Sequence, residues 1–156
     1  MEYLDQLKRR IALPSTPQRI ISLVPSQTEL LVDLGLEERI VGVTKFCVHP
    51  LELKNRKTII GGTKDYRMDV IDSLYPDLII GNKEENEQEG IEELMGKYPV
   101  WMSDIYTLAD SLEMIEGLGE MLAAEEKAEA IIKQLNSDFE IPFHKKGSAI
   151  YLIWKN

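Results

Sequence analysis

The sequence predicts an α/β fold of three layers, in which a mainly parallel sheet lies between two layers of helices. Short apolar runs alternate with amphipathic segments along the chain. A strand–turn–helix unit, seen first at residues 19–31, recurs four times. Strands that alternate with helices form parallel sheets through right-handed crossovers, so we expect one such sheet to organise the chain.

The composition is that of a single globular domain. The 156 residues are 44% hydrophobic and 29% charged, which is ordinary for a folded protein. A net charge of −9 argues against a nucleic-acid partner, because phosphate binding depends on clustered Lys and Arg. The first ten residues are charged where a signal peptide is apolar, so the chain as written is expected to be cytoplasmic.

Seven short segments, most of them rich in aliphatic residues, are expected to be strands. The segment at residues 20–24 is largely apolar, as in a strand covered on both faces. The expected strands cover residues 11–13, 20–24, 39–44, 58–60, 77–81, 100–102 and 148–154.

Two capping boxes predict where helices begin. Ser26 and Glu29 have the spacing in which a hydroxyl and a carboxylate bond to free backbone N–H groups, and so do Thr107 and Asp110. Ser26 is therefore expected to cap the first long helix, and Gly35 to end it.

Four more helical segments follow from apolar spacing. One covers residues 68–74 and stops before Pro76, and the next covers residues 90–97. In the helix that follows Thr107, Gly117 and Gly119 are expected to mark the end or a kink. A longer helix is expected over residues 123–139, with its buried side formed by Ala128, Ile131, Ile132, Leu135 and Phe139.

The carboxyl ends of parallel strands share one edge of the sheet, which is where such sheets bind ligands. Turn residues that follow the predicted strands should therefore meet at this edge. They cover residues 25–27, 45–47, 62–64, 82–83 and 103–104.

Five motifs follow one another in an order and spacing that resemble a known family. They are Asp5-x-Leu-x-Arg9 with Leu13-Pro14, then Arg19-Ile-Ile-Ser-Leu-Val-Pro-Ser-x-Thr-Glu-Leu30, Ile40-Val-Gly-Val43, Ile60-Gly-Gly62 and Tyr75-Pro-Asp-Leu-Ile-Ile-Gly81. The chain resembles the amino-terminal lobe of the ABC-importer substrate-binding proteins for cobalamin and ferric siderophores, whose two lobes are joined by one long backbone helix.

This resemblance implies a division of the chain. Residues 1–118 would form the ligand-binding lobe, residues 119–141 the bridging backbone helix, and residues 147–156 the opening strand of a second lobe that is missing. An opening strand without its sheet exposes unpaired backbone groups, so self-association through this strand, as a homo-oligomer, is expected.

The resemblance also implies a site. Its pattern places Asp69 at the outer tip, where an acidic residue meets the membrane permease, and Lys8 where a glycine is usual. Stacking on the ligand would come from Phe46, with Tyr66 or Trp101. The ligand would be cobalamin or a ferric siderophore, with no intrinsic cofactor, and the protein would be periplasmic or cell-surface. With the residues of the sheet edge, the expected ligand contacts are Pro25, Ser26, Phe46, Gly62, Thr63, Asn82 and Asp104.

Other readings of individual motifs are weaker. Cys47 and His49 are too few for a zinc site, which needs three or four protein ligands. Residues 61–64 lack the spacing of a phosphate loop, and residues 84–89 lack the alternating ligands and central glycine of a calcium loop. No Gly-x-Ser-x-Gly elbow or partnered histidine supports catalysis, so neither a metal site nor an enzyme is expected.

Several alternatives stay open at this point. Phe46 is as compatible with the core as with a pocket wall, and the acidic Asp69 is also what a helix dipole favours near its amino terminus. For the whole chain, the alternatives are an intracellular protein that handles corrinoids or metal cofactors, and a non-binding half that self-associates.

Overall fold

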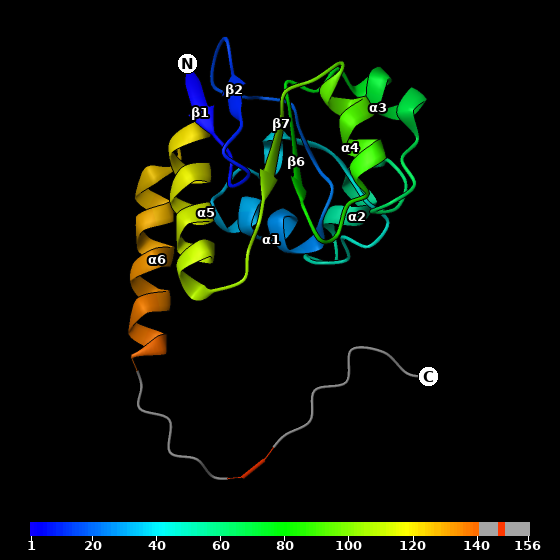
Figure 1. Ribbon diagram of the computed structural model, residues 1–156. Coiled ribbons are helices and arrows are strands. Elements are labelled where there is room, and N and C mark those ends of the chain that lie inside the picture. The colour runs from blue at the N-terminus through cyan, green and yellow to red at the C-terminus, as the bar shows by residue number, and fades with distance from the viewer. Residues whose placement is uncertain (141–146, 149–156) are drawn as a thin grey trace.

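The computed structural model describes residues 1–140 and 147–148 (Figure 1). The strand predicted at residues 148–154, and the self-association expected through it, therefore fall outside the described residues, apart from Ser148. No helix in the described part is long and apolar enough to cross a bilayer.

A parallel sheet of five strands lies at the centre of the described part, in the order β5-β4-β3-β6-β7. Every neighbouring pair is parallel, which confirms the predicted fold class. Each of the five strands falls within or next to a segment that the sequence predicts to be a strand. They are β3 (Ile20–Ser22), β4 (Ile40–Val43), β5 (Thr58–Ile59), β6 (Leu78–Asn82) and β7 (Val100–Ser103).

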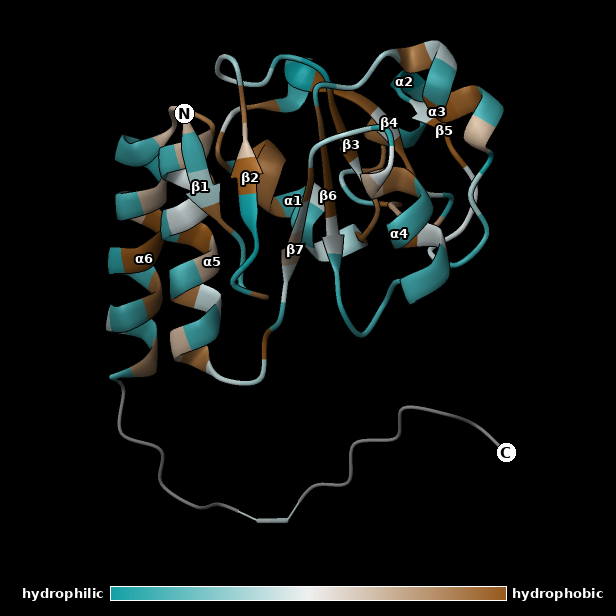
Figure 2. Ribbon diagram, turned by 45° about the horizontal axis from the view of Figure 1, so that its top comes forward, coloured by the Kyte–Doolittle hydropathy of each residue, from teal (hydrophilic) through white to brown (hydrophobic). Residues whose placement is uncertain are grey.

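Helices cover both faces of this sheet and make three layers (Figure 1). Because successive strand residues point to opposite faces, Ile20 packs in one core cluster and Ile21 in the other. In Figure 2 the hydrophobic colour is concentrated on the strands and on the inner sides of the helices. One face carries α1 (Pro25–Asp33), α2 (Leu53–Arg56), α5 (Leu108–Met121) and α6 (Glu125–Phe139), and the other carries α3 (Met68–Leu74) and α4 (Gln88–Met95).

An antiparallel hairpin of β1 (Glu2–Leu4) and β2 (Arg10–Ala12) precedes the sheet. The sequence predicts only its second strand. The hairpin lies beside the edge strand β7, where the backbone N–H of Gln6 donates to the Met102 carbonyl (3.1 Å). In the connection between its strands, Lys8 has a φ of 61°, a left-handed conformation that glycine adopts more readily than lysine.

The predicted cap of α1 is wrong. The helix begins at Pro25, whose ring fixes the φ angle that a first helical residue needs, and Val24 is the capping residue. Ser26 therefore lies inside the first turn, where its hydroxyl donates to Gln27 Oε1 (3.1 Å) instead of accepting from the backbone. The predicted end of α1 is confirmed, because Gly35 has a φ of 75° directly after the helix.

The predictions for the last two helices need correction as well. α5 runs without interruption through Gly117 and Gly119, and it ends at Met121. α6 begins at Glu125 rather than at residue 123, since Ala123 is in the left-handed region. On the expected buried side of α6, only Ala128 is buried, and Phe139 is exposed.

Other differences are small. The capping box of Thr107 and Asp110 is confirmed, with both hydrogen bonds formed. α3 has the predicted bounds, and α4 begins two residues earlier than predicted. Two short elements were not predicted from the sequence: the one-turn helix α2 and a 3₁₀ turn at Glu37–Arg39.

Candidate functional site

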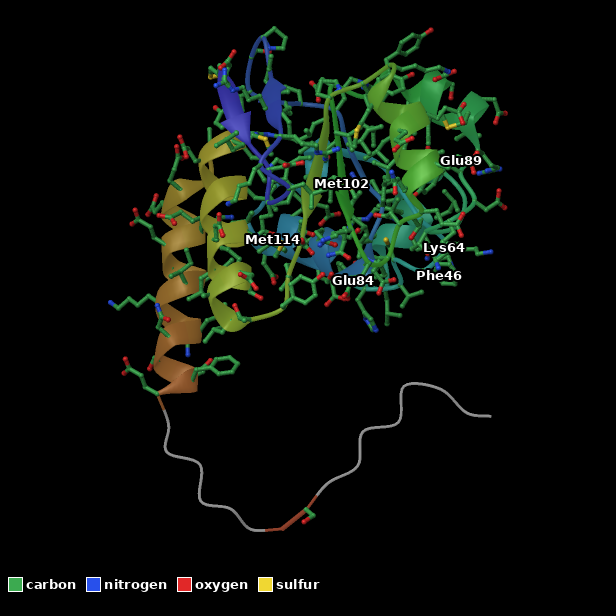
Figure 3. The ribbon with its side chains drawn as sticks, in the orientation of Figure 1. Phe46, Lys64, Glu84, Glu89, Met102 and Met114 are labelled. Carbon is green, nitrogen blue, oxygen red and sulfur yellow. The ribbon has the colours of Figure 1, made fainter. Side chains whose placement is uncertain are left out.

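The turns that follow the five parallel strands meet at one edge of the sheet, as predicted. Since neighbouring strands point the same way, their carboxyl ends lie side by side in the order of the sheet. Figure 3 shows Phe46, Lys64 and Glu84 together at the end of the molecule toward which β6 and β7 run. We call this end the strand-tip edge.

A cavity of about 420 Å³ opens at the strand-tip edge between the first turn of α1 and the loop after β6. Three of the predicted contacts line it: Pro25 is half-buried, Ser26 is exposed, and Asn82 is buried. Sequence reasoning placed Gln27 at this edge without naming it as a contact, and it missed the other four residues of the lining. The whole lining is Val24, Pro25, Ser26, Gln27, Asn82, Glu84, Glu85 and Ile105.

Phe46 and Gly62 form a second part of the strand-tip edge. A methyl group on Gly62 would lie 3.5 Å from the ring of Phe46, so the ring lies against the turn after β5. The Phe46 side chain is 50% exposed, and the ammonium of Lys45 lies 5.2 Å from the centre of its ring. Phe46 is therefore an exposed aromatic surface rather than a core residue, and it does not line the cavity described above.

The backbone carbonyl of Thr63 accepts two side-chain hydrogen bonds. The donors are the Tyr66 hydroxyl (2.7 Å) and the Asn86 side-chain amide (2.9 Å), so the turn after β5 is tied to the loop after β6. Burial raises the pKa of Tyr66 to about 12. The tyrosine hydroxyl consequently stays protonated, and remains a donor, at every physiological pH.

Asp104 contributes a charge pair to the strand-tip edge. Its Oδ2 accepts from the ammonium of Lys83 (2.8 Å), and this bond raises the pKa of the lysine. Its Oδ1 is buried and has no hydrogen-bond partner among the described residues. The same ammonium lies 5.9 Å from the ring of Tyr106, an exposed aromatic that sequence reasoning also missed.

Asp69 lies apart from these groups. It is exposed in the first turn of α3 and does not line the cavity. Tyr66 and Trp101 differ from Phe46 in exposure: Tyr66 is half-buried, and Trp101 is 2% exposed with its indole N–H bonded to the Leu4 carbonyl (3.3 Å). The expectation that Trp101 stacks on a ligand is therefore not supported by its position.

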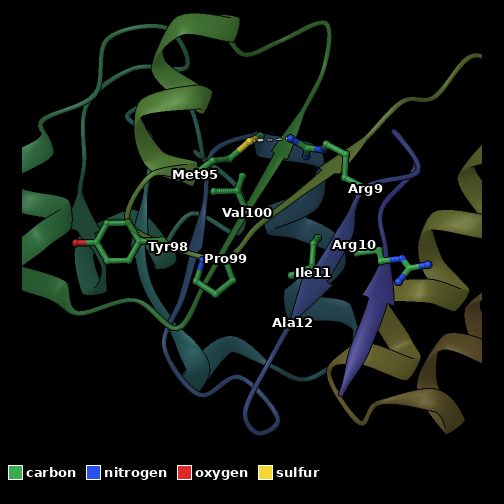
Figure 4. Close-up of a pocket in the computed structure, with 8 residues that line it drawn as sticks. All are labelled: Arg9, Arg10, Ile11, Ala12, Met95, Tyr98, Pro99 and Val100. Atoms are coloured by element: carbon green, nitrogen blue, oxygen red, sulfur yellow. Dashed lines mark hydrogen bonds between the residues drawn. The ribbon is translucent and has the colours of Figure 1, made fainter.

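Another cavity, of about 350 Å³, lies between the hairpin and the amino end of β7 (Figure 4). The guanidinium of Arg9 reaches across it to the sulfur of Met95, as the dashed line shows (2.8 Å). This arginine is already paired with the buried carboxylate of Asp5. The cavity does not include a predicted contact, and the strand-tip edge remains the candidate site.

No group of three or more His, Cys, Asp and Glu side chains in the described part of the chain is arranged to hold a metal ion. Cys47 instead lies buried among hydroxyl groups, with its sulfur 3.1 Å from Thr28 Oγ1 and 3.3 Å from Thr44 Oγ1. The acidic side chains of Glu84 and Glu85 are exposed.

The described part is thus an α/β lobe with a parallel sheet and a cavity at its strand tips, the edge at which sheets of this kind bind ligands. Residues 20–140 match the family of periplasmic binding proteins, and the chain belongs to this family. Its members are named for binding rather than for catalysis.

Three comparisons show what the chain is similar to. The uncharacterized ABC transporter substrate-binding lipoprotein YvrC of Bacillus subtilis is 29% identical over 140 residues, covering 87% of this chain and 44% of that protein. A vitamin B12-binding protein of Pectobacterium carotovorum is 31% identical over 114 residues, covering 72% of this chain and 41% of that protein. A periplasmic heme-binding protein from Pseudomonas aeruginosa superimposes with a TM-score of 0.72 at 27% identity, covering 78% of this chain and 44% of that structure. The chain thus spans less than half the length of these relatives.

Proposed function

We propose that this chain is the ligand-binding lobe of a solute-binding protein of an ABC importer, which binds cobalamin or another corrinoid, or a ferric siderophore, and delivers it to the permease. The observation that carries the proposal is the meeting of the strand tips at one edge of the sheet, where the turns after β3, β6 and β7 line a cavity and the exposed ring of Phe46 lies at the same edge (Figure 3). The function is reversible binding, without covalent chemistry.

Bulky, flat ligands suit this edge for a physical reason. A half-exposed aromatic ring such as Phe46 gains free energy when a flat apolar surface covers it. Polar groups elsewhere at the strand-tip edge, the Ser26 hydroxyl and the Lys83 ammonium among them, would orient the polar substituents of the ligand. Names among the relatives include vitamin B12 and heme binding, and both of these ligands are metal-centred macrocycles.

The division of the chain that goes with this proposal is a binding lobe over residues 1–118, a bridging segment over residues 119–141 that includes α6, and the opening of a second lobe over residues 147–156. The location that goes with it is outside the cytoplasm, in the periplasm or at the cell surface, in keeping with the words "periplasmic" and "lipoprotein" in the names of its relatives.

Calorimetric titration with cyanocobalamin, hemin and ferrichrome tests the binding function. We expect at least one of the three to bind, and Phe46→Ala to weaken that binding by about tenfold, equivalent to roughly 1.4 kcal/mol. Phe139→Ala is the matched control, because this ring on α6 is similarly exposed but lies outside the strand-tip edge. Absence of binding by all three, or equal affinity of the wild type and Phe46→Ala, would contradict the proposal.

Asp69 is our candidate for the contact with the permease, since it is acidic, exposed and outside the ligand cavity. Asp69→Lys should abolish stimulation of the permease ATPase while the ligand affinity stays unchanged. Asp65→Lys, another exposed acidic residue a few positions earlier, is the control. Equal loss in both variants would argue for a general charge effect and against a specific contact at Asp69.

A further inference from the structure

Ser103, the last residue of β7, is completely buried, and its hydroxyl joins two side-chain amides. Its Oγ donates to the Gly81 carbonyl (3.3 Å) and accepts from Gln27 Nε2 (2.8 Å) and Asn82 Nδ2 (3.0 Å). A hydroxyl has one proton and two lone pairs. Since the proton is used on Gly81, both amides must turn their NH₂ groups toward Ser103.

This constraint sets where the two amide oxygens point. Oε1 of Gln27 accepts the hydroxyl of Ser26 (3.1 Å) on one wall of the cavity. Oδ1 of Asn82 accepts the backbone N–H groups of Glu84 (2.9 Å) and Glu85 (3.1 Å) on the opposite wall. Ser103 itself is not part of the lining.

We propose that Ser103 is a positioning residue for the ligand cavity: one buried hydroxyl fixes the orientation of the Gln27 and Asn82 amides, and through them the polar groups on both walls. The inference rests on the proposed function for its effect on affinity. Without the hydroxyl, either amide can turn by half a rotation and present NH₂ where its neighbours need an acceptor. The backbone N–H groups of Glu84 and Glu85 would then lose their acceptor, and the Ser26 hydroxyl would have to accept a hydrogen bond from Gln27 instead of donating one.

A second buried serine offers a matched control. Ser22 ends β3, is as fully buried as Ser103, and also joins two neighbours: its Oγ accepts from Thr28 Oγ1 (2.7 Å) and donates to the Val24 carbonyl (3.2 Å). Neither neighbour is a side-chain amide, so no group there has an NH₂ and an oxygen that could exchange places. Ser22→Ala thus deletes one buried hydroxyl without disturbing an amide.

Hydrogen exchange of the backbone amides of Glu84 and Glu85, measured by NMR, tests the positioning directly. We expect Ser103→Ala to accelerate their exchange by at least about tenfold, and Ser22→Ala to change it by less than about twofold. Ser103→Thr, which keeps the hydroxyl, should restore protection. Unchanged exchange in Ser103→Ala, or equal acceleration in both alanine variants, would overturn the proposal. Ser103→Cys, whose thiol is a weak acceptor, replaces Ser103→Ala if that variant does not fold.

Ligand affinity provides the second measurement, with cyanocobalamin, hemin and ferrichrome as probes. Ser103→Ala should weaken the binding of whichever probe the wild type binds by at least about fivefold, and Ser22→Ala should leave it unchanged at a temperature where both are folded. Equal weakening in both variants would show a purely structural role. If the wild type binds no probe, the proposed function fails, and hydrogen exchange alone still decides whether Ser103 orders the walls.

Discussion

Gly119 on α5 and Ala128 on α6 lie so close that a methyl group on the glycine would be 2.5 Å from the methyl group of the alanine. Real side-chain carbons do not approach so closely. The glycine that sequence reasoning takes as a helix end is therefore the point at which the two helices touch. Its small size sets the distance between their axes.

Gly119→Ala should destabilise the protein. The added methyl must push α6 away from α5, and overpacking of this kind costs about 1–3 kcal/mol. Gly117→Ala is the control, because no described heavy atom other than the adjoining residues and backbone of α5 lies within 4 Å of a methyl group there. That variant should be neutral or stabilising by up to about 1 kcal/mol, since alanine favours helix over glycine. Urea denaturation measures both, and a similar loss in the two variants would contradict the close packing.

Thr107→Ala should cost about 1 kcal/mol of unfolding free energy, because the threonine side chain accepts the Asp110 N–H at the start of α5. Ser26→Ala should cost much less, since Ser26 does not cap α1 despite the same sequence spacing. Thermal unfolding of the two variants distinguishes them. A larger loss in Ser26→Ala would favour the sequence-based prediction over the structure.

Lys8→Gly should stabilise the protein by about 1 kcal/mol. The left-handed conformation at this position is strained for lysine, whereas glycine adopts it without this strain. The ion pair of Lys8 with Glu113 is exposed on both sides, so its loss should subtract little. Lys8→Ala separates the two effects, because it removes the charge but keeps the backbone strain. A destabilised Lys8→Gly variant would contradict the assignment of backbone strain to Lys8.

Stability should fall in alkaline solution partly through Tyr66. Burial raises its pKa to about 12 from an ordinary value of 10.0, so the folded state holds the phenol proton more tightly than the unfolded chain. Its contribution is complete below about pH 10 and is lost as the pH rises toward about 12. Tyr66→Phe should therefore flatten the fall in unfolding free energy between about pH 10 and about pH 12.

Two other tyrosines complete this test. The hydrogen bond to Asp72 raises the pKa of Tyr98 to about 12 as well, so part of the alkaline fall should remain in Tyr66→Phe. Tyr106→Phe, at an exposed position, is the control and should follow the wild type. The same slope in all three proteins would rule out the assigned role of Tyr66.

Much of the fold could be predicted because its signals are local. Burial of one or both faces of an element leaves a repeating pattern of apolar residues along the chain. The apolar run at residues 20–24 and the apolar spacing in α3 are such patterns. The errors arose where a distant contact or a neighbouring residue determines the local structure. The helix α1 begins at Pro25, before the predicted cap at Ser26. The glycine at position 119 is required by the close contact with Ala128 and does not end the helix.

The candidate site divides in the same way. Its place at the strand tips follows from the order of strands and helices, and Pro25, Ser26 and Asn82 do line one cavity there. The roles of Gln27 and Ser103 could not be predicted, because their hydrogen bond joins residues 76 positions apart. The only local signal was that both residues follow or end predicted strands.

The amino-terminal hairpin has a consequence for solubility. It occupies the outer flank of β7 near Met102, where a bare strand would otherwise offer its backbone to a strand from another molecule. An incoming chain must first displace the hairpin, together with the indole bond between Trp101 and Leu4. Loss of the first dozen residues would thus turn this flank into a nucleus for intermolecular sheet growth.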